Sequence, residues 1–192
     1  MDLQDKVAFI TGGASGLGRA TAENFIKAGA KVMVFDLNAE TAEQAAAELG
    51  ANASFAAGDV ADEDAVRAAV QKTVETFGGL HINVNSAGIG AAARTLGREG
   101  PMPLKTFEFI VRVNLIGTFN VLRLCADAMQ HNAPVTDDGE RGVIINVASV
   151  AAFDGQIGQA AYSASKGGVA GMTLPIARDL VKQGIRCVTI AP

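Results

Sequence analysis

Three side chains in the C-terminal half of the sequence have the types and spacing of an acid–base unit. Tyr162 and Lys166 are four residues apart, so in a helix they share one face. Free tyrosine has a pKa of about 10, but a nearby ammonium favours the phenolate. Ser149 follows an apolar run, 143–147, at the edge where parallel sheets bind ligands. The pattern predicts proton transfer, and it is informative only beside a cofactor-binding turn.

Such a turn is present at residues 11–18 (TGGASGLG), between an apolar run and a helical stretch. Its glycines let the backbone approach a pyrophosphate, and the helix N-terminus offers free N–H groups. The spacing is not the common G-x-G-x-x-G, because Thr21 takes the last position, nor that of triphosphatases, because Arg19 follows Gly18. The alternative, a glycine-rich turn without a ligand, is disfavoured by this strand–helix context.

The second feature of the cofactor site is Asp36, which closes the apolar run 32–35. It follows Gly18 by 18 residues, near the spacing of about 20 for the acid that binds the ribose 2′-hydroxyl. A carboxylate there repels a 2′-phosphate, which favours NAD over NADP. The alternatives are that Asp36 caps a helix, and that Arg19, otherwise a solvated residue, tolerates a phosphate.

The elements that position these residues alternate between strands and helices. We expect strands at 7–10, 32–35, 54–57, 82–85, 143–147 and 187–190. We expect a helix ending at Gly29 and others at 39–49, 62–77, 106–129 and 159–182, the last bent at Pro175. This rhythm predicts an α/β fold, a Rossmann-like doubly wound parallel sheet with helices on both faces. Two polar loops, 93–105 and 131–142, are predicted to be surface insertions.

Composition narrows the class of protein. The 192 residues predict one domain at about 150 residues per domain, and 49% hydrophobic residues exclude a disordered chain. A net charge of −4 excludes nucleic acid as the main partner, and no apolar run approaches the roughly 18 residues of a membrane span. Two cysteines predict a reducing compartment, and the expected location is the cytoplasm, with the mitochondrial matrix as the alternative. His81 and His131 lack companion ligands, so no metal site is expected.

From Lys6 to Pro192 the chain resembles the short-chain dehydrogenase/reductase family. The resemblance is carried by the glycine turn, Asp59-Val60, residues 85–88 (NSAG), Asn114, Ser149 and the Tyr162/Lys166 pair. It looks closest to the branch of type-2 3-hydroxyacyl-CoA dehydrogenases that also act on hydroxysteroids. Residues 141–154 (RGVIINVASVAAFD), residues 158–179 and the two insertions carry that likeness. The second residue of the NSAG motif, Ser86, is usually Asn in the family.

The resemblance assigns roles to individual residues. It implies that Tyr162 is the general acid/base, that Lys166 holds the nicotinamide ribose and lowers the tyrosine pKa, and that Ser149 binds the reacting oxygen. Asn114 would position a water in the proton relay. NAD would be bound by Gly12, Ser15, Gly16, Leu17, Gly18, Asp36, Asp59, Val60, Ser86, Gly88, Tyr162 and Lys166.

The expected function is an NAD-dependent oxidoreductase that interconverts a secondary alcohol and a ketone, with an acyl-CoA or a steroid alcohol as substrate. The alternatives are an NADPH-dependent 3-oxoacyl reductase and a cofactor-binding scaffold without turnover. The family also implies a homotetramer built on the helices at 106–129 and 159–182, where Gly167, Gly168 and Gly171 permit close approach. Because family members continue past the equivalent of Pro192, we expect the domain at 1–192 to be truncated, with its C-terminal strand missing.

Overall fold

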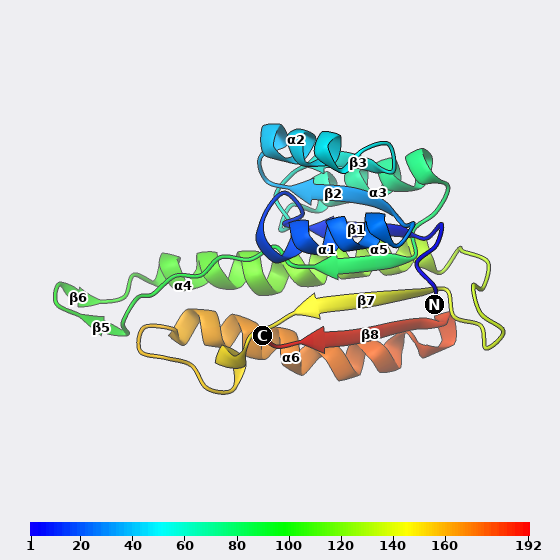
Figure 1. The fold of residues 1–192 in the computed structure, drawn as a ribbon. Helices are drawn as coiled ribbons and strands as arrows, with labels where there is room; N and C mark the ends of the chain where they lie inside the picture. The colour runs from blue at the N-terminus through cyan, green and yellow to red at the C-terminus, as the bar shows by residue number, and fades with distance from the viewer.

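Six parallel strands form the central sheet of the protein, seen in a computed structural model that describes all residues 1–192. The strand order is β3-β2-β1-β4-β7-β8, as Figure 1 shows. The strands are β1 (Val7–Thr11), β2 (Lys31–Asp36), β3 (Ala53–Ala57), β4 (Ile82–Asn85), β7 (Gly142–Val147) and β8 (Ile185–Ile190). Every neighbouring pair is parallel, which confirms the predicted doubly wound sheet.

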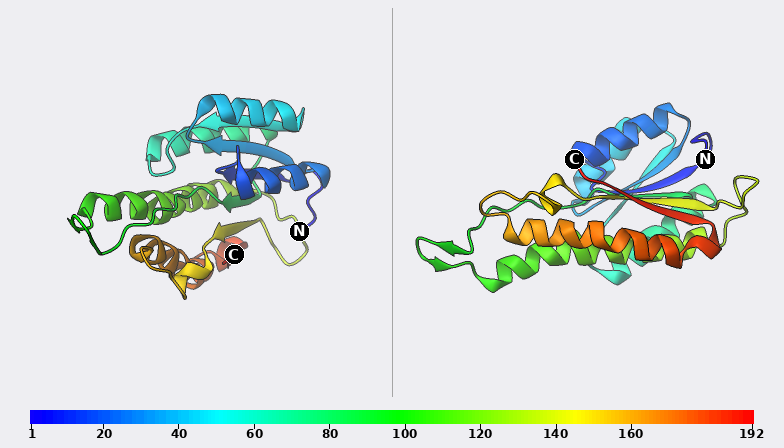
Figure 2. Two further views of the ribbon diagram at one scale, coloured as in Figure 1. Left: turned by 60° about the vertical axis from the view of Figure 1, so that its left-hand side comes forward. Right: turned by 90° about the horizontal axis from the view of Figure 1, so that it is seen from below.

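Helices cover both faces of this sheet (Figure 2). The main helices are α1 (Gly16–Lys27), α2 (Ala39–Leu49), α3 (Glu63–Phe77), α4 (Leu104–Val111), α5 (Thr118–Met129) and α6 (Ala160–Asp179). Ala22 of α1 and Ala42 of α2 pack on one face of the sheet, against Ile10 and its neighbours. Helices α3, α5 and α6 pack on the other face. Burial on both faces explains why the strands are continuous apolar runs.

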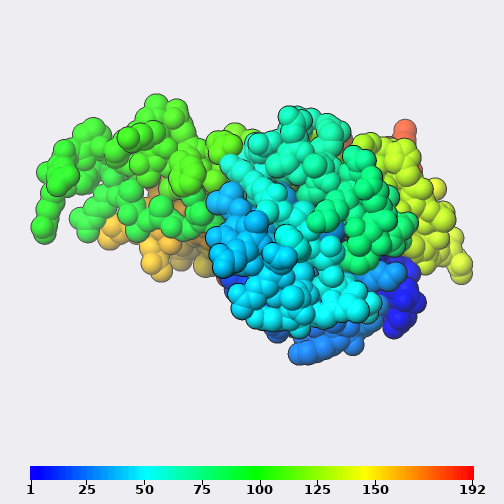
Figure 3. Space-filling view, turned by 90° about the horizontal axis from the view of Figure 1, so that it is seen from above, coloured from blue at the N-terminus to red at the C-terminus, as the bar shows by residue number.

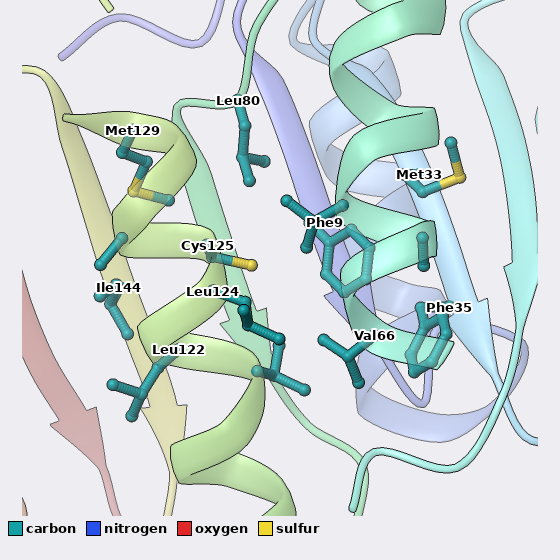
Figure 4. Packing of buried hydrophobic residues seen from close by; sticks show 14 of the residues in the cluster. Phe9, Met33, Phe35, Val66, Leu80, Leu122, Leu124, Cys125, Met129 and Ile144 are labelled. Atoms are coloured by element: carbon teal, nitrogen blue, oxygen red, sulfur yellow. The ribbon is translucent and has the colours of Figure 1, made fainter. Parts of the chain in front are cut away.

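The larger core lies between the sheet and the layer of α3 and α5. Phe9 and Phe35 point into it from β1 and β2, with ring centroids 5.3 Å apart. Figure 4 shows these rings facing Val66 of α3 and Leu124 of α5. Fully burying a side chain of this size contributes roughly 1.5–3 kcal/mol, so this core holds the strand ends in fixed positions.

The chain reverses direction in the sheet between β1 and β4. It runs outward from β1 through β2 to β3, and then returns to β4, β7 and β8 on the other side. The connections after β1 and β4 therefore leave the sheet in opposite directions. In open α/β sheets, ligands bind in the crevice that such a reversal opens at the carboxyl ends of the strands.

The helix predicted at 106–129 is longer and less regular than expected. It begins at Leu104, and a π-helical turn, η1 (Arg112–Gly117), separates α4 from α5. A π turn fits one extra residue into the helix and is frequent at functional sites. Here it contains Asn114. By length and composition the span Leu104–Met129 could cross a membrane, contrary to the sequence expectation, but 56% of its most apolar window is buried inside the protein.

The two insertion loops lie on the surface, as predicted, but both contain structure. The segment 93–105 contains a small hairpin of β5 (Leu96–Gly97) and β6 (Gly100–Pro101), and Figure 3 shows the hairpin and α4 extending beyond the body. The segment 131–142 is anchored by Asn132, whose side-chain amide donates to the carbonyls of Leu80, at 2.6 Å, and Arg141, at 3.2 Å.

The last predicted helix is shorter than expected. Helix α6 ends at Asp179, and a 3₁₀ turn, η3 (Val181–Gln183), follows. Pro175 lies inside α6, which continues through it for four more residues. A second 3₁₀ turn, η2 (Val150–Ala152), follows β7 directly and begins at Ser149.

Candidate active site

Two adjoining cavities lie at the carboxyl ends of the strands. The larger, of about 460 Å³, is lined by the β1–α1 turn and by the ends of β2, β3 and β4. The smaller, of about 250 Å³, is lined by Ser149, Tyr162 and Lys166. Both are lined by Leu17, Ser86, Gly88 and Ile89, so they form one groove. The groove brings the predicted nucleotide-binding turn together with Ser149, Tyr162 and Lys166.

The glycines of the β1–α1 turn each have a steric reason to be there. Gly12 and Gly16 have φ values of +62° and +52°, which favour glycine. At Gly18 a Cβ would overlap the carbonyl oxygen of Gly12. These glycines line the larger cavity, so the turn presents its backbone directly to the groove.

The N-terminus of α1 opens into this groove without a side chain capping it. Ser15 is the N-cap residue, but its hydroxyl makes no capping hydrogen bond. The first turn contains no acidic residue either. Its backbone N–H groups and positive dipole end are therefore available to an anion. The donor set fits the pyrophosphate of a dinucleotide.

Asp36 closes β2 at the edge of the larger cavity. One carboxylate oxygen accepts from the N–H of Ala14, at 3.1 Å, and the other from the N–H of Leu37, at 2.8 Å. These bonds hold the carboxylate against the β1–α1 turn. Each carboxylate oxygen retains a lone pair, so the group can also accept from two ribose hydroxyls.

The loop after β3 forms the far end of the same cavity. The Asp59 carboxylate accepts from the N–H of Ala61, at 2.8 Å, and pairs with the Arg112 guanidinium at 2.9 Å. The Asn120 side-chain amide donates to the carbonyl of Val60, at 2.9 Å. The predicted residues Asp59 and Val60 are thus held in place from the helix that contains the π turn.

Ser86 joins the two strands on either side of the reversal point. Its hydroxyl donates to the carbonyl of Thr11, at the end of β1. The Thr11 hydroxyl accepts in return from the N–H of Ala87, at 3.0 Å. The ends of β1 and β4 are therefore cross-linked directly beneath the groove. This side-chain contact is additional to the backbone role that the sequence predicts for Ser86.

Lys166 is buried beside the predicted catalytic tyrosine. Its ammonium donates to the carbonyl of Val147, at 2.7 Å, and lies 5.8 Å from the centroid of the Tyr162 ring. Only 5% of the residue is exposed, and this burial lowers the pKa of Lys166 from 10.5 to about 8. The ammonium has three donors, so two remain for ribose hydroxyls and other groups in the groove.

Ser149 has its hydroxyl hydrogen available for a ligand. The hydroxyl oxygen accepts from the N–H of Ala151, at 3.2 Å, where it caps η2. The O–H bond itself has no acceptor within the protein, so it can donate into the smaller cavity. Tyr162 lines the same cavity, and its phenol makes no hydrogen bond within the protein. A substrate oxygen in this cavity can therefore meet both hydroxyl groups.

Asn114 is fully buried beneath the groove and does not line it. Its side-chain oxygen accepts from the N–H of Ile89, at 2.8 Å, and its NH₂ group donates to the carbonyl of Ile89, at 2.9 Å. Its own carbonyl accepts from the Thr118 hydroxyl, at 2.7 Å. The structure thus gives Asn114 a bracing contact to the loop after β4. Its place in a proton relay stays a prediction.

A row of buried amides behind the groove was missed by sequence reasoning. Asn85 donates to the side-chain oxygens of Asn83, at 2.7 Å, and Asn146, at 2.9 Å, across β4 and β7. Asn146 in turn donates to the Cys187 sulfur, at 3.6 Å. Amide residues within otherwise apolar runs were the available signal. No group of three or more His, Cys, Asp or Glu side chains is placed to hold a metal ion.

The sequence was also compared with known proteins. Residues 6–192 match the family model described as short chain dehydrogenase. The chain belongs to the short-chain dehydrogenase family. As a short-chain dehydrogenase it is an oxidoreductase that acts on CH–OH groups of a small-molecule substrate with a nicotinamide cofactor, which agrees with the chemistry of the groove.

This short-chain dehydrogenase is similar to several proteins named 3-hydroxyacyl-CoA dehydrogenase type-2. It is 54% identical to a 3-hydroxyacyl-CoA dehydrogenase type-2 of Bos taurus over 97% of this chain and 72% of the bovine protein. For the Drosophila melanogaster protein of that name the identity is 52%, over 99% of this chain and 75% of the relative. A crystal structure of 3-hydroxyacyl-CoA dehydrogenase type-2 from Mycobacterium avium matches with a TM-score of 0.93 and 40% identity, covering 100% of this chain and 76% of that one.

Proposed function

We propose that this protein is an NAD-dependent dehydrogenase that interconverts a (3S)-3-hydroxyacyl-CoA and a 3-oxoacyl-CoA, or a hydroxysteroid and its ketone. The observation that carries the proposal is the continuous groove. It joins a dinucleotide-binding turn to a cavity lined by Ser149, Tyr162 and Lys166. The substrate class is supported by the names of the relatives that share more than half of the aligned residues.

The residues of the smaller cavity divide the chemistry between them. When bound, the nicotinamide cofactor takes up or supplies the hydride. In the oxidation direction the Ser149 O–H donates to the substrate oxygen and holds it, while the Tyr162 oxygen accepts the hydroxyl proton. In reduction Tyr162 returns that proton. The Lys166 ammonium stabilises negative charge on the phenol and holds a ribose hydroxyl, and its anchor on the Val147 carbonyl keeps it in place.

A direct assay tests this function. The protein is mixed with NAD and 3-hydroxybutyryl-CoA, or with NAD and a secondary steroid alcohol, and NADH formation is followed by absorbance. Turnover of either substrate is the expected result. Faster turnover of acetoacetyl-CoA with NADPH than with NADH would favour the 3-oxoacyl reductase instead. NADH binding without turnover of any alcohol or ketone would indicate a cofactor-binding scaffold.

Two observations support NAD as the cofactor. The Asp36 carboxylate lies at the edge of the groove, where it would repel a 2′-phosphate. Arg19, which could have favoured NADP, is already engaged. It pairs with Glu23 at 2.8 Å and Glu48 at 3.1 Å, and it donates to the carbonyl of Ala45. These contacts link α1 to α2, so the Arg19 guanidinium is already paired and is not available to a 2′-phosphate in the groove.

Replacing Asp36 is expected to weaken the preference for NADH. Asp36→Ser removes the charged carboxylate and its repulsion and shortens the side chain that would reach the ribose hydroxyls, so the ratio of NADPH to NADH affinity should rise at least about tenfold, or about 1.4 kcal/mol. Binding is measured by fluorescence titration. Asp36→Asn isolates the effect of the charge, because it keeps an acceptor for the Ala14 N–H, and it should raise the same ratio. Equal binding of both cofactors by the unmodified protein would contradict the proposal.

We also propose that the protein is a homotetramer that buries the outer faces of α5 and α6. A groove of about 300 Å³ runs between these helices, beside the exposed side chain of Phe119. The three glycines predicted to permit close approach differ in their surroundings. A Cβ added to Gly168 would lie 2.7 Å from a methyl carbon of Leu115, so this glycine is packed within the molecule. A Cβ on Gly167 would lie 3.7 Å from the Ala152 carbonyl oxygen, and Gly171 faces open space. Both cysteines are free and buried, which supports a reducing compartment, the cytoplasm or the mitochondrial matrix.

Light scattering is expected to give the mass of four chains at micromolar concentration. Gly171→Arg should lower that mass, because a long charged side chain would occupy the contact face. The substitution replaces a helical glycine by a better helix former, so the fold itself should be retained. A wild-type protein that stays monomeric at every concentration would show that these faces do not associate.

A further inference from the structure

Ser165 is a buried hydroxyl in the middle of the catalytic segment of α6. It lies between Tyr162 and Lys166, and its exposed fraction is 0%. Its oxygen accepts from the side-chain NH₂ of Asn114, at 3.1 Å, and its hydrogen is donated to the carbonyl of Tyr162, at 2.7 Å. The hydroxyl therefore connects the backbone of the catalytic tyrosine to the π turn.

The Asn114 amide at the other end of this connection has a single possible orientation. Its oxygen accepts from the N–H of Ile89, and this bond distinguishes the oxygen of the side-chain amide from its nitrogen. Both N–H bonds of the NH₂ group are then used, one on the carbonyl of Ile89 and one on Ser165. Because this amide is fully buried, removing the Ser165 oxygen would leave one of its donors without a partner.

The connection joins three segments that come from different parts of the chain. They are the loop after β4, the π turn and α6. A Cβ placed on Gly88 would lie 3.2 Å from the Asn114 side-chain oxygen and 3.4 Å from the Lys166 ammonium nitrogen. The Asn114 amide and the Lys166 ammonium therefore both lie next to Gly88, a residue that lines the groove. A change in how α6 is rotated would move Tyr162 and Lys166 together relative to that loop.

We propose that Ser165 is a positioning residue for the reaction, acting through Asn114 and Tyr162. Its hydrogen bond with Asn114 sets the rotation of α6 against the loop that lines the nucleotide groove, and so fixes the phenol relative to bound cofactor and substrate. Its bond to the Tyr162 carbonyl lies within α6 and orients the hydroxyl so that its oxygen faces Asn114. A misplacement of about 1 Å at a reacting centre can lower a rate about a hundredfold. This role rests on the proposed dehydrogenase function.

The same helix offers a matched control at Ser163. Ser163 is next to Tyr162 in the sequence, and Ser165 is next to Lys166. The Ser163 hydroxyl is also buried, but it has no hydrogen-bond partner. Ser163→Ala therefore makes the same chemical change as Ser165→Ala in the same segment of α6, but it breaks no hydrogen bond. It also removes the atom that would contact a Cβ on Gly155.

The experiment compares the full chain with its Ser165→Ala, Ser165→Cys and Ser163→Ala variants. For Ser165→Ala we expect kcat to fall at least about tenfold, with KM for the nucleotide within about twofold, because the phenol is misplaced while the nucleotide turn is untouched. The pH profile of kcat should also change. Amide exchange at Ile89, measured by NMR without cofactor, should be about tenfold faster, because the Asn114 side chain that accepts from this N–H loses a brace. Ser163→Ala should leave all of these unchanged.

Two results would overturn the proposal. One is a Ser165→Ala variant with wild-type kcat, pH profile and Ile89 exchange. The other is a variant with lower thermal stability but unchanged kcat, which would make Ser165 a structural residue only. If Ser165→Ala does not fold, Ser165→Cys keeps the volume with a weaker donor and acceptor, and kcat between twofold and tenfold below wild type is expected. A wild-type chain that turns over no alcohol would refute the proposed function, and Ile89 exchange would still test whether Ser165 braces Asn114.

Discussion

Tyr162→Phe is expected to lower kcat at least about a hundredfold while NADH binding persists. General acid–base groups contribute roughly 10²–10⁴-fold, and this is the only phenol in the chain, so no other tyrosine can replace it. The phenol makes no hydrogen bond within the protein and lines the smaller cavity. Its removal should therefore leave the fold and the nucleotide turn unchanged.

Three measurements separate the expected effect from damage to the fold. Stopped-flow or steady-state assays give kcat, a fluorescence titration gives NADH affinity, and thermal unfolding gives stability. We expect kcat alone to change. Because Ser149, Tyr162 and Lys166 act as a unit, a double variant that also lacks the Ser149 hydroxyl should lose less than the product of the two single losses. A Tyr162→Phe enzyme that keeps most of its activity would show that the proton comes from another group.

Lys166→Met is expected to remove activity and to stabilise the protein without cofactor. The ammonium serves both the ribose and the phenol, so nucleotide affinity and kcat should both fall, with kcat/KM lower by about a thousandfold or more. Methionine has nearly the length of the lysine stem and fills the same buried space. The gain in stability arises because the folded protein holds a cation that burial disfavours.

The pH dependence of that stabilisation follows from the lowered pKa. Burial lowers the pKa of Lys166 from 10.5 to about 8, so the folded protein binds this proton less tightly than the unfolded chain does. Below pH 8 the charged lysine destabilises the fold by up to about 3 kcal/mol, and stability increases as the pH rises from about 8 to about 10.5. Loss of the charge-assisted bond to the Val147 carbonyl offsets about 2 kcal/mol of the gain, so the net stabilisation at pH 7 is about 1 kcal/mol.

Denaturant unfolding of Lys166→Met and wild type, without cofactor, tests this directly. The variant should be more stable at pH 7, and the difference should shrink steadily toward pH 10.5. Lys182→Met is the matched control, because this lysine is exposed in η3, and its change should stay within about 0.5 kcal/mol. A Lys166→Met protein less stable than wild type at pH 7 would mean that the ammonium contributes more through its contacts than burial takes away.

The sequence by itself determined the class of the protein and most of its groove. The glycine turn, Asp36 and the Tyr162/Lys166 pair could be identified because each depends on local geometry. A turn needs glycine where φ is positive, and a helix places residues four apart on one face. The alternation of apolar runs with helical stretches determined the parallel sheet, since such runs are buried on both faces. The carboxyl ends of those strands then had to meet at one edge.

Only the tertiary structure decided which of those residues are fixed, and by what. Asn114 and Ile89 are 25 residues apart, and Asn114 and Ser165 are 51 apart, so no local pattern predicts their contacts. The π turn that admits Asn114 has no periodic signal, because it adds one residue to an otherwise regular helix. The lowered pKa of Lys166 and the commitment of Arg19 to Glu23 and Glu48 likewise depend on burial and on neighbours from other elements, which exist only once the chain has folded.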